Sequence, residues 1–382
     1  MARPCACTPP SWRPDLVDGP DYAEEVARID GYDTIPSVLP NPPAGRGLTH
    51  GQLVRRTVAN VLAGRGYTEV LTYPFVAEGL WDDLGLAPAD PRRSAIRVAN
   101  PLSDEAPLMR TSVLDTLVDA LRRNVSRGMK DVALFELGLV TRPVPGSSHT
   151  APVPPVDKRP DDATIASIDA AVPPQPRRAA LLVAGDIERA GWWGRGRAVD
   201  WTDAVDAVAA MAGALALDLR VESDADQPPW HPGRCARLLL ADGTLVGHAG
   251  ELHPTVLSRL GLPAGCVAAD VDIDVLVAAS VQPPQQRDFS AHPVAWSDVA
   301  LTVDEAVTAG AVEAALRSGA GPLLEAVVLF DVYRGEQVGA AKKSLAFRLA
   351  FRAPDRTLTT DEVSRFRDAA VSATAALGAV QR

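Results

Sequence analysis

The chain has 382 residues, of which 47% are hydrophobic and 23% charged, a balance typical of two or three globular domains. Its formal net charge of −10 excludes nucleic-acid binding through overall charge, so any such contact needs a local basic patch. Four cysteines are too few for a disulfide framework, and no two of them have the spacing of a zinc site. No apolar run reaches the roughly 18 residues that a membrane-spanning helix needs.

The N-terminal stretch, residues 1–45, is expected to hold a short acidic helix and a Pro-rich tail. The Asp-Gly-Pro sequence at 18–20 is typical of a helix start, because proline is favoured at the first helical position. Four carboxylates gather around this start: Asp15, Asp21, Glu24 and Glu25. They either meet the positive end of the helix dipole or supply oxygen ligands to a hard cation such as Mg²⁺, and spacing alone favours the dipole.

Residues 46–280 are expected to alternate helices and strands. Thr49 and Gln52 have capping-box spacing and predict a helix that ends near Gly64. The elements expected after it are a strand at 68–75, a helix at 111–127, and largely apolar strands at 131–140 and 179–186.

Residues 141–178 contain nine prolines and few large apolar side chains, so an extended loop or linker is expected there. Trp192 and Trp193 follow in the Gly-rich sequence GWWGRGR. Adjacent tryptophans either line a pocket or an interface, or pack inside the fold. Packing is the expected role for such large aromatic side chains.

Residues 286–382 are expected to form a compact unit with the order β-α-β-β-α-β, the ferredoxin-like split arrangement. Along its strand 342–352, large apolar residues alternate with small or basic ones, which predicts one core face and one face suited to RNA phosphates. A solvated edge whose charges prevent aggregation is an equally good interpretation of the residues alone. The candidate RNA-binding cations are Arg334, Lys342, Lys343, Arg348 and Arg352.

No catalytic set stands out, and no catalytic residue is expected in this chain. The G-x-x-x-x-G-K-[ST] and G-x-S-x-G patterns are both absent. His231 and His253 each precede a proline, so we expect them to be turn residues rather than bases.

Eight runs, in order along nearly the whole chain, resemble the bacterial phenylalanyl-tRNA synthetase beta subunit. A single run of this kind is weak support, whereas eight in register are strong support. The runs are PSWRPDL (10–16), EEVARIDGYDTIPSVLP (24–40), NPLSDEAPLMRTSVLDTLVDALRRN (100–124), LFELGLV (134–140), WHPGRCARL (230–238), GHAGELHP (247–254), LFDVYRGEQVGAAKKSLAFRL (329–349) and FRAPDRTLTTDEV (351–363).

The resemblance implies an α+β fold in three parts. Residues 1–45 resemble the end of a small B5-type domain. Residues 46–280 resemble a degenerate class II aminoacyl-tRNA synthetase module with a mixed sheet, and residues 286–382 the ferredoxin-fold anticodon-binding domain. Relatives also carry an N-terminal tRNA-binding domain and an editing domain, which we expect to be missing here. The opening MARPCACTP replaces the strand expected before PSWRPDL, so we expect a truncated reading frame or a gene fragment.

The resemblance also implies a cytoplasmic beta subunit of phenylalanine–tRNA ligase, which attaches phenylalanine to tRNA-Phe together with an alpha subunit in an α₂β₂ assembly. ATP would be used at the active site of the alpha subunit. The four N-terminal carboxylates match beta-subunit positions that hold Mg²⁺ near the alpha subunit. Arg110 is a candidate remnant of the second class II motif, and no third-motif arginine is found, so the chain alone is expected to be inactive.

The resemblance favours RNA as the ligand of the strand 342–352. At one place this sequence differs from the family. Ala295 and Trp296 stand where many relatives have arginines, although Trp296 offers a stacking surface. Two other functions stay open. One is a truncated, non-catalytic relative that binds tRNA or protein. The other, an unrelated metal-dependent enzyme, is weaker because four acids without a base or nucleophile make no reaction.

Overall fold

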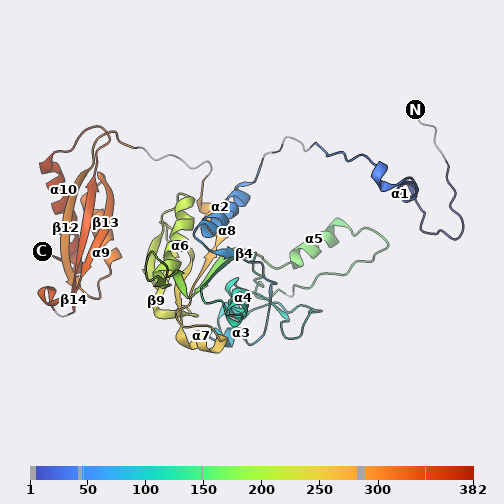
Figure 1. Ribbon diagram of the computed structural model, residues 1–382, viewed down its shortest axis with the longest axis horizontal. Coiled ribbons are helices and arrows are strands. Elements are labelled where there is room, and N and C mark those ends of the chain that lie inside the picture. Colours follow the sequence, from blue (N-terminus) through green and yellow to red (C-terminus); the bar gives the residue numbers. More distant parts are fainter. Residues whose placement is uncertain (1–5, 42–44, 46, 148, 282–288, 340) are drawn as a thin grey trace. The chain divides into compact units, whose positions relative to one another are not determined.

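The computed structural model of the chain describes residues 6–41, 45, 47–147, 149–281, 289–339 and 341–382 (Figure 1). The chain divides into two compact units, residues 1–49 and 50–382. The expected start of the last domain at residue 286 and residues 1–5 of the MARPCACTP opening lie outside the described residues. Within the described part, no helix is both long and apolar enough to cross a membrane.

The first unit contains helix α1 (Gly19–Asp30) and a short 3-10 helix, η1 (Tyr32–Thr34). The predicted helix start is confirmed, with proline in the first turn. The Asp21 carboxylate accepts hydrogen bonds from the backbone N–H groups of Val17 and Asp18, at 2.8 and 3.0 Å. No residue of α1 is buried, so local capping rather than packing defines where this helix begins.

The larger sheet of the second unit has seven strands in the order β1-β4-β5-β11-β10-β9-β8. The edge pair β1–β4 is parallel and all other neighbours are antiparallel. The strands are β1 (Thr68–Glu69), β4 (Val132–Leu139), β5 (Arg177–Ala184), β8 (Arg220–Ser223), β9 (Trp230–Leu239), β10 (Leu245–Leu252) and β11 (Val267–Asp272).

Helices cover both faces of this sheet, which explains why its central strands are apolar on both sides. On β5, Leu181 and Val183 join the core under one set of helices, while Leu182 faces the other set. The first set is α2 (His50–Gly64), α6 (Trp201–Ala214) and α8 (Ile273–Ala279). The second set is α3 (Leu80–Asp83), α4 (Leu114–Ser126) and α7 (Pro254–Leu260). The predicted helix at 111–127 and the two apolar strands are confirmed.

Two local predictions were wrong. The strand expected at 68–75 splits into β1 and β2 (Phe75–Val76), and β2 pairs with β3 (Leu108–Met109) instead of the main sheet. Pro74, which has no N–H to donate, stands between the two pieces. The Pro-rich segment 141–178 contains a helix, α5 (Asp162–Ala171). Its start is fixed by the Asp161 carboxylate, which accepts a hydrogen bond from the N–H of Thr164 at 2.8 Å.

Two glycines of the GHAGELHP run allow β10 to lie between its neighbours. A Cβ at Gly247 would overlap the backbone oxygen of Asp270 on β11. A Cβ at Gly250 would overlap the backbone oxygen of Arg234 on β9. The glycines therefore allow close strand packing.

The C-terminal part has the ferredoxin-like order that the sequence predicted. Its sheet runs β13-β14-β12-β15, and the helices pack on one face of it. The elements are β12 (Ala295–Asp304), α9 (Ala309–Ala320), β13 (Leu324–Tyr333), η3 (Glu336–Val338), β14 (Lys342–Phe351), α10 (Thr360–Ala373), η4 (Thr374–Leu377) and β15 (Val380–Gln381) (Figure 1). Leu345, Phe347, Leu349 and Phe351 are buried, so the predicted core face of this strand is confirmed.

Candidate functional site

A polar cavity of about 430 Å³ opens on the seven-stranded sheet. Four neighbouring strands supply its floor and walls, and loop residues form its rim. The lining side chains with charge or hydrogen-bonding groups are Asp90, Arg92, Thr111, Arg142, Arg178, Gln227, Trp230, His248, Asp270 and Asp272. Charged residues inside otherwise apolar strands were the signal that could have identified this cavity from the sequence.

The floor of the cavity is an ion network centred on Arg178. Its Nε donates to Asp270 at 2.6 Å, and its Nη1 donates to Asp272 at 3.1 Å. The other Asp270 oxygen accepts the Ser112 hydroxyl at 2.6 Å. Burial alone would raise the pKa of Asp270, but the Arg178 charge and these hydrogen bonds hold it below its ordinary value. The floor is therefore ionised and largely satisfied by its own partners.

The rim of the cavity is also largely self-satisfied. Arg92 pairs with Asp90 at 2.7 Å and donates to the backbone oxygen of Pro228 at 2.8 Å. Burial lowers the pKa of His248 despite its contact with Asp224, so this ring is uncharged at neutral pH. The arrangement can hold a small polar molecule, but two of its three lining arginines, Arg92 and Arg178, are engaged by aspartates, so they do not form an open triphosphate clamp.

Arg110, the expected remnant of an ATP-binding arginine, lies in the interior and outside the cavity lining. Its Nη1 donates to the Glu136 carboxylate at 2.7 Å and to the hydroxyls of Thr116 and Thr72 at 2.8 and 3.0 Å. Its Nε donates to the backbone oxygen of Leu139 at 3.0 Å. This side chain joins β4 to the loop before α4, which is a structural role.

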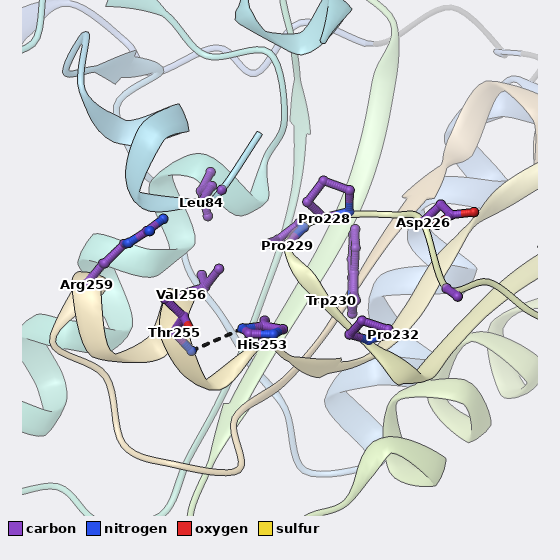
Figure 2. A pocket seen from close by; sticks show the side chains of 12 residues that line it. Leu84, Asp226, Pro228, Pro229, Trp230, Pro232, His253, Thr255, Val256 and Arg259 are labelled. Carbon is purple, nitrogen blue, oxygen red and sulfur yellow. Dashed lines mark hydrogen bonds between the residues drawn. The ribbon is translucent and has the colours of Figure 1, made fainter. Parts of the chain in front are cut away.

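A second cavity, of about 350 Å³, has largely apolar walls and shares the lining residue Trp230 with the first; Figure 2 shows this second cavity. His253 lines it and caps α7, since its Nδ1 accepts the N–H of Thr255 at 3.1 Å (Figure 2). His231 accepts the N–H of Gly233 at 3.0 Å in the same way. The two rings stack with centroids 5.9 Å apart. His253 stands at the turn into α7, as predicted, whereas His231 lies within strand β9 and the prediction of a turn there was wrong.

The four N-terminal carboxylates are held by separate partners. Arg13 bridges Asp15 and Glu25, and Glu25 also pairs with Arg28. These guanidinium groups lower the pKa of Glu25 to about 2.

Asp21 caps the helix start, and Glu24 accepts the Tyr32 hydroxyl at 2.6 Å. Among the described residues, no three His, Cys, Asp or Glu side chains are placed to hold a metal ion. As arranged, the carboxylates do not fit Mg²⁺, because their oxygens are directed at different partners.

The predicted RNA-binding cations are mostly neutralised by acids from other elements. Arg334 pairs with Glu305 at 2.7 Å, and Arg348 with Asp298 at 2.8 Å. Arg352 lies 2.7 Å from Glu325. These three carboxylates were missed because they come from β12, the turn after it and β13, which lie far from β14 in the sequence.

Two lysines of the predicted set differ in their surroundings. Lys343 is buried, and its ammonium donates to the backbone oxygen of Glu305 at 2.8 Å, so it is directed into the fold. Lys342 is exposed and has no ion pair with any described residue. It lines a shallow depression beside Arg334.

The open face of the C-terminal sheet carries aromatic side chains as well as charge. Trp296 is 60% exposed and Phe330 is 53% exposed. The Arg348 guanidinium lies over the Phe330 ring, 5.3 Å from its centroid. Trp296 and Asp298 are two residues apart on β12, and Asp298 is opposite Arg348, so Trp296 shares this face. Phe330 is the residue of this face that sequence reasoning missed.

The expectation that Trp192 and Trp193 pack inside the fold was wrong. They lie in the turn between β6 (Asp186–Glu188) and β7 (Arg197–Ala198), and both are exposed. A two-stranded hairpin outside the main sheet has no second layer to cover its tip.

Comparisons with known proteins agree along most of the chain. Residues 35–273 match the family described as "Phenylalanyl tRNA synthetase beta chain CLM domain". Residues 290–382 match "Ferredoxin-fold anticodon binding domain".

Relatives named "Phenylalanine--tRNA ligase beta subunit" include proteins of Streptomyces avermitilis (53% identical over 368 residues) and Thermobifida fusca (52% over 379 residues). A third, from Mycolicibacterium paratuberculosis, is 47% identical over 375 residues. These alignments cover 96%, 98% and 98% of the chain, but only 44%, 45% and 45% of the respective relatives. The chain therefore spans less than half the length of the curated relatives it matches.

Proposed function

Because the chain belongs to the phenylalanyl-tRNA synthetase beta-chain family, we propose that it acts as a beta-type subunit of phenylalanine–tRNA ligase. In this role it contributes tRNA binding and subunit assembly to the ATP-dependent attachment of phenylalanine to tRNA-Phe. The observation that carries the proposal is the combination, in one chain, of the matched beta-chain domain and the matched anticodon-binding domain.

The chemistry belongs to a partner subunit in this proposal. We assign residues 46–280 to a degenerate class II synthetase-like module, which the largely antiparallel sheet covered by helices supports. An ATP site of that class needs free arginines aimed at the triphosphate. Here Arg178 is held by Asp270 and Asp272, and Arg110 by Glu136. ATP and its Mg²⁺ are therefore used at the active site of the alpha subunit.

The remaining organisation follows from the same assignment. The beta-subunit names of the relatives support an alpha-subunit partner, and we propose an α₂β₂ assembly in the cytoplasm. The proposed domains are the B5-type remnant at 1–45, the synthetase-like module at 46–280 and the anticodon-binding domain at 286–382. The Pro-rich segment 141–178 is an insertion in the second domain.

The first test uses the purified chain alone. We expect no phenylalanine-dependent ATP–pyrophosphate exchange above background, because two of the three cavity arginines, Arg92 and Arg178, are engaged by carboxylates. The alpha subunit from the same organism, added at equal concentration, should co-elute with the chain in size exclusion. Exchange by the chain alone would contradict the assignment of the chemistry to its partner.

We place the tRNA contact on the open face of the C-terminal sheet. Lys342 supplies charge for the phosphate backbone, and Trp296 and Phe330 supply surfaces for unpaired bases. Arg348 and Arg352 also bind phosphate, once phosphate has displaced their carboxylate partners. Arg334 lies at the border of this face. Lys343 positions the turn after β12 rather than touching RNA, because its ammonium is engaged inside the fold.

We propose that Asp15, Asp21, Glu24 and Glu25 bind Mg²⁺ only when Arg13 releases two of them. Arg13→Gln should therefore bind Mg²⁺ more tightly than the wild-type chain, since Asp15 and Glu25 lose their shared cation. Isothermal titration with MgCl₂ measures the difference, and Arg122→Gln, on α4, is the control. Equal, negligible heats for Arg13→Gln and wild type would leave Asp21 a helix cap, Asp15 and Glu25 ordinary ion-pair partners, and Glu24 the acceptor of the Tyr32 hydroxyl.

A further inference from the structure

The hairpin β6–β7 presents two adjacent tryptophans to solvent. Trp192 is 95% exposed and Trp193 is 66% exposed. Their rings meet edge to face, with centroids 5.7 Å apart and an interplanar angle of 76°. Tryptophan is among the residues most enriched in the energetic centres of protein interfaces. A pair exposed to this degree is therefore a candidate contact rather than a packing element.

The backbone of this tip is tightly constrained, so the rings are presented in a defined arrangement. Gly191 and Gly194 exchange two backbone hydrogen bonds, at 2.9 and 3.0 Å. The Trp193 indole N–H donates to the backbone oxygen of Arg189 at 3.0 Å, and its ring leaves no room for a Cβ at Gly191. Gly196 has a φ of +77°, a conformation that other residues rarely adopt. Such preorganisation reduces the entropy lost on binding.

The charges around the tip favour a protein partner over RNA. Arg197 is held by Asp203 at 2.7 Å and by Glu188 at 3.3 Å. Arg189 lies 3.9 Å from Asp131. RNA binding needs a concentration of positive charge, which this pairing removes. Arg195 is exposed and forms no ion pair or hydrogen bond through its side chain with the described residues, so it can meet a carboxylate beside an apolar pocket.

We propose that Trp192, Trp193 and Arg195 form a docking surface for the partner subunit of the assembly. The matching surface on that subunit is an apolar pocket that accepts the Trp192 ring, with a carboxylate at its edge for Arg195. Paired charges around the tip form the polar rim that surrounds such an anchor. This inference rests on the proposed function, because that function supplies the partner.

The test compares the affinity of the full chain for the alpha subunit with that of three variants. Trp192→Ala should weaken binding by about tenfold or more, as expected for an interface anchor. Arg195→Gln should weaken it less, and the Trp192→Ala/Trp193→Ala double variant more. Leu102→Ser is the matched control, since Leu102 is a large apolar side chain that is 88% exposed in another loop. Thermal unfolding midpoints should be unchanged for Trp192→Ala and for the control.

Each alternative outcome overturns the inference in a recognisable way. If the double variant binds the alpha subunit with wild-type affinity, the two tryptophans are not a docking surface, and the proposed function is unaffected. A variant that loses only tRNA affinity assigns the hairpin to RNA instead. A variant that loses only self-association, measured by light scattering, assigns it to a second copy of this chain. A wild-type chain that does not bind the alpha subunit contradicts the proposed function itself.

Discussion

Replacing Arg110 with alanine is expected to lower the free energy of unfolding by about 3–5 kcal/mol, because it leaves the buried Glu136 carboxylate without its cation. Both side chains are at most 5% exposed, so water cannot replace the lost partner. The same change also removes donors to Thr72, Thr116 and the backbone of Leu139. Chemical denaturation, followed by circular dichroism, measures the difference.

The double variant Arg110→Met/Glu136→Leu separates the ion pair from the packing around it. Because it leaves no unpaired charge, it should be more stable than Arg110→Ala. Arg122→Ala, which breaks an exposed pair with Asp119, is the control and should change little. A loss below about 1 kcal/mol for Arg110→Ala would show that the network is hydrated and that its charges are not buried.

Removing the aromatic side chains from the open face of the C-terminal sheet is the second large effect. Trp296→Ala and Phe330→Ala should each weaken tRNA-Phe binding by about 1–3 kcal/mol, roughly fivefold or more, if each ring stacks on one base. Both side chains are more than half exposed, so the fold should persist. Filter binding or fluorescence anisotropy with tRNA-Phe transcripts measures the loss.

A salt series distinguishes stacking from phosphate contact. Lys342→Ala should flatten the dependence of affinity on salt by roughly one unit, because one phosphate contact and its released counterion are lost. The Trp296 and Phe330 variants should keep the wild-type slope. Arg348→Ala should alter the slope less than Lys342→Ala, since its guanidinium is already paired with Asp298. Flattened slopes in the aromatic variants would contradict the stacking role.

The sequence predicted helices and strands correctly where their apolar residues form a long, uninterrupted pattern. The strands at 131–140 and 179–186 are continuous apolar runs, and β4 and β5 are buried on both faces. Helix α5 was missed because its neighbours are rich in proline, and the single cap at Asp161 outweighs that composition locally. The exposure of Trp192 could not be predicted, because composition does not reveal that β6 and β7 form a separate hairpin.

The candidate sites were less predictable than the fold because charge partners come from distant parts of the chain. The candidate RNA-binding cations, from Arg334 to Arg352, were grouped by their positions along the sequence. Asp298 neutralises Arg348 across the sheet, 50 residues away. Arg13 likewise reaches from before α1 to Glu25 and occupies two of the carboxylates that the resemblance assigned to a metal. Sequence spacing defines which charged groups share a face. Ion pairs with residues from distant parts of the chain decide which of those groups remain free to bind a ligand.

We propose above all that this chain is a non-catalytic, tRNA-binding subunit of phenylalanine–tRNA ligase. The most direct test is charging of tRNA-Phe with labelled phenylalanine by the chain and the alpha subunit, mixed and separately. We predict charging by the mixture, none by the chain alone, and a reduced rate at limiting tRNA when the mixture contains Trp296→Ala. Charging by the chain alone, or a mixture no more active than the alpha subunit by itself, would contradict the account.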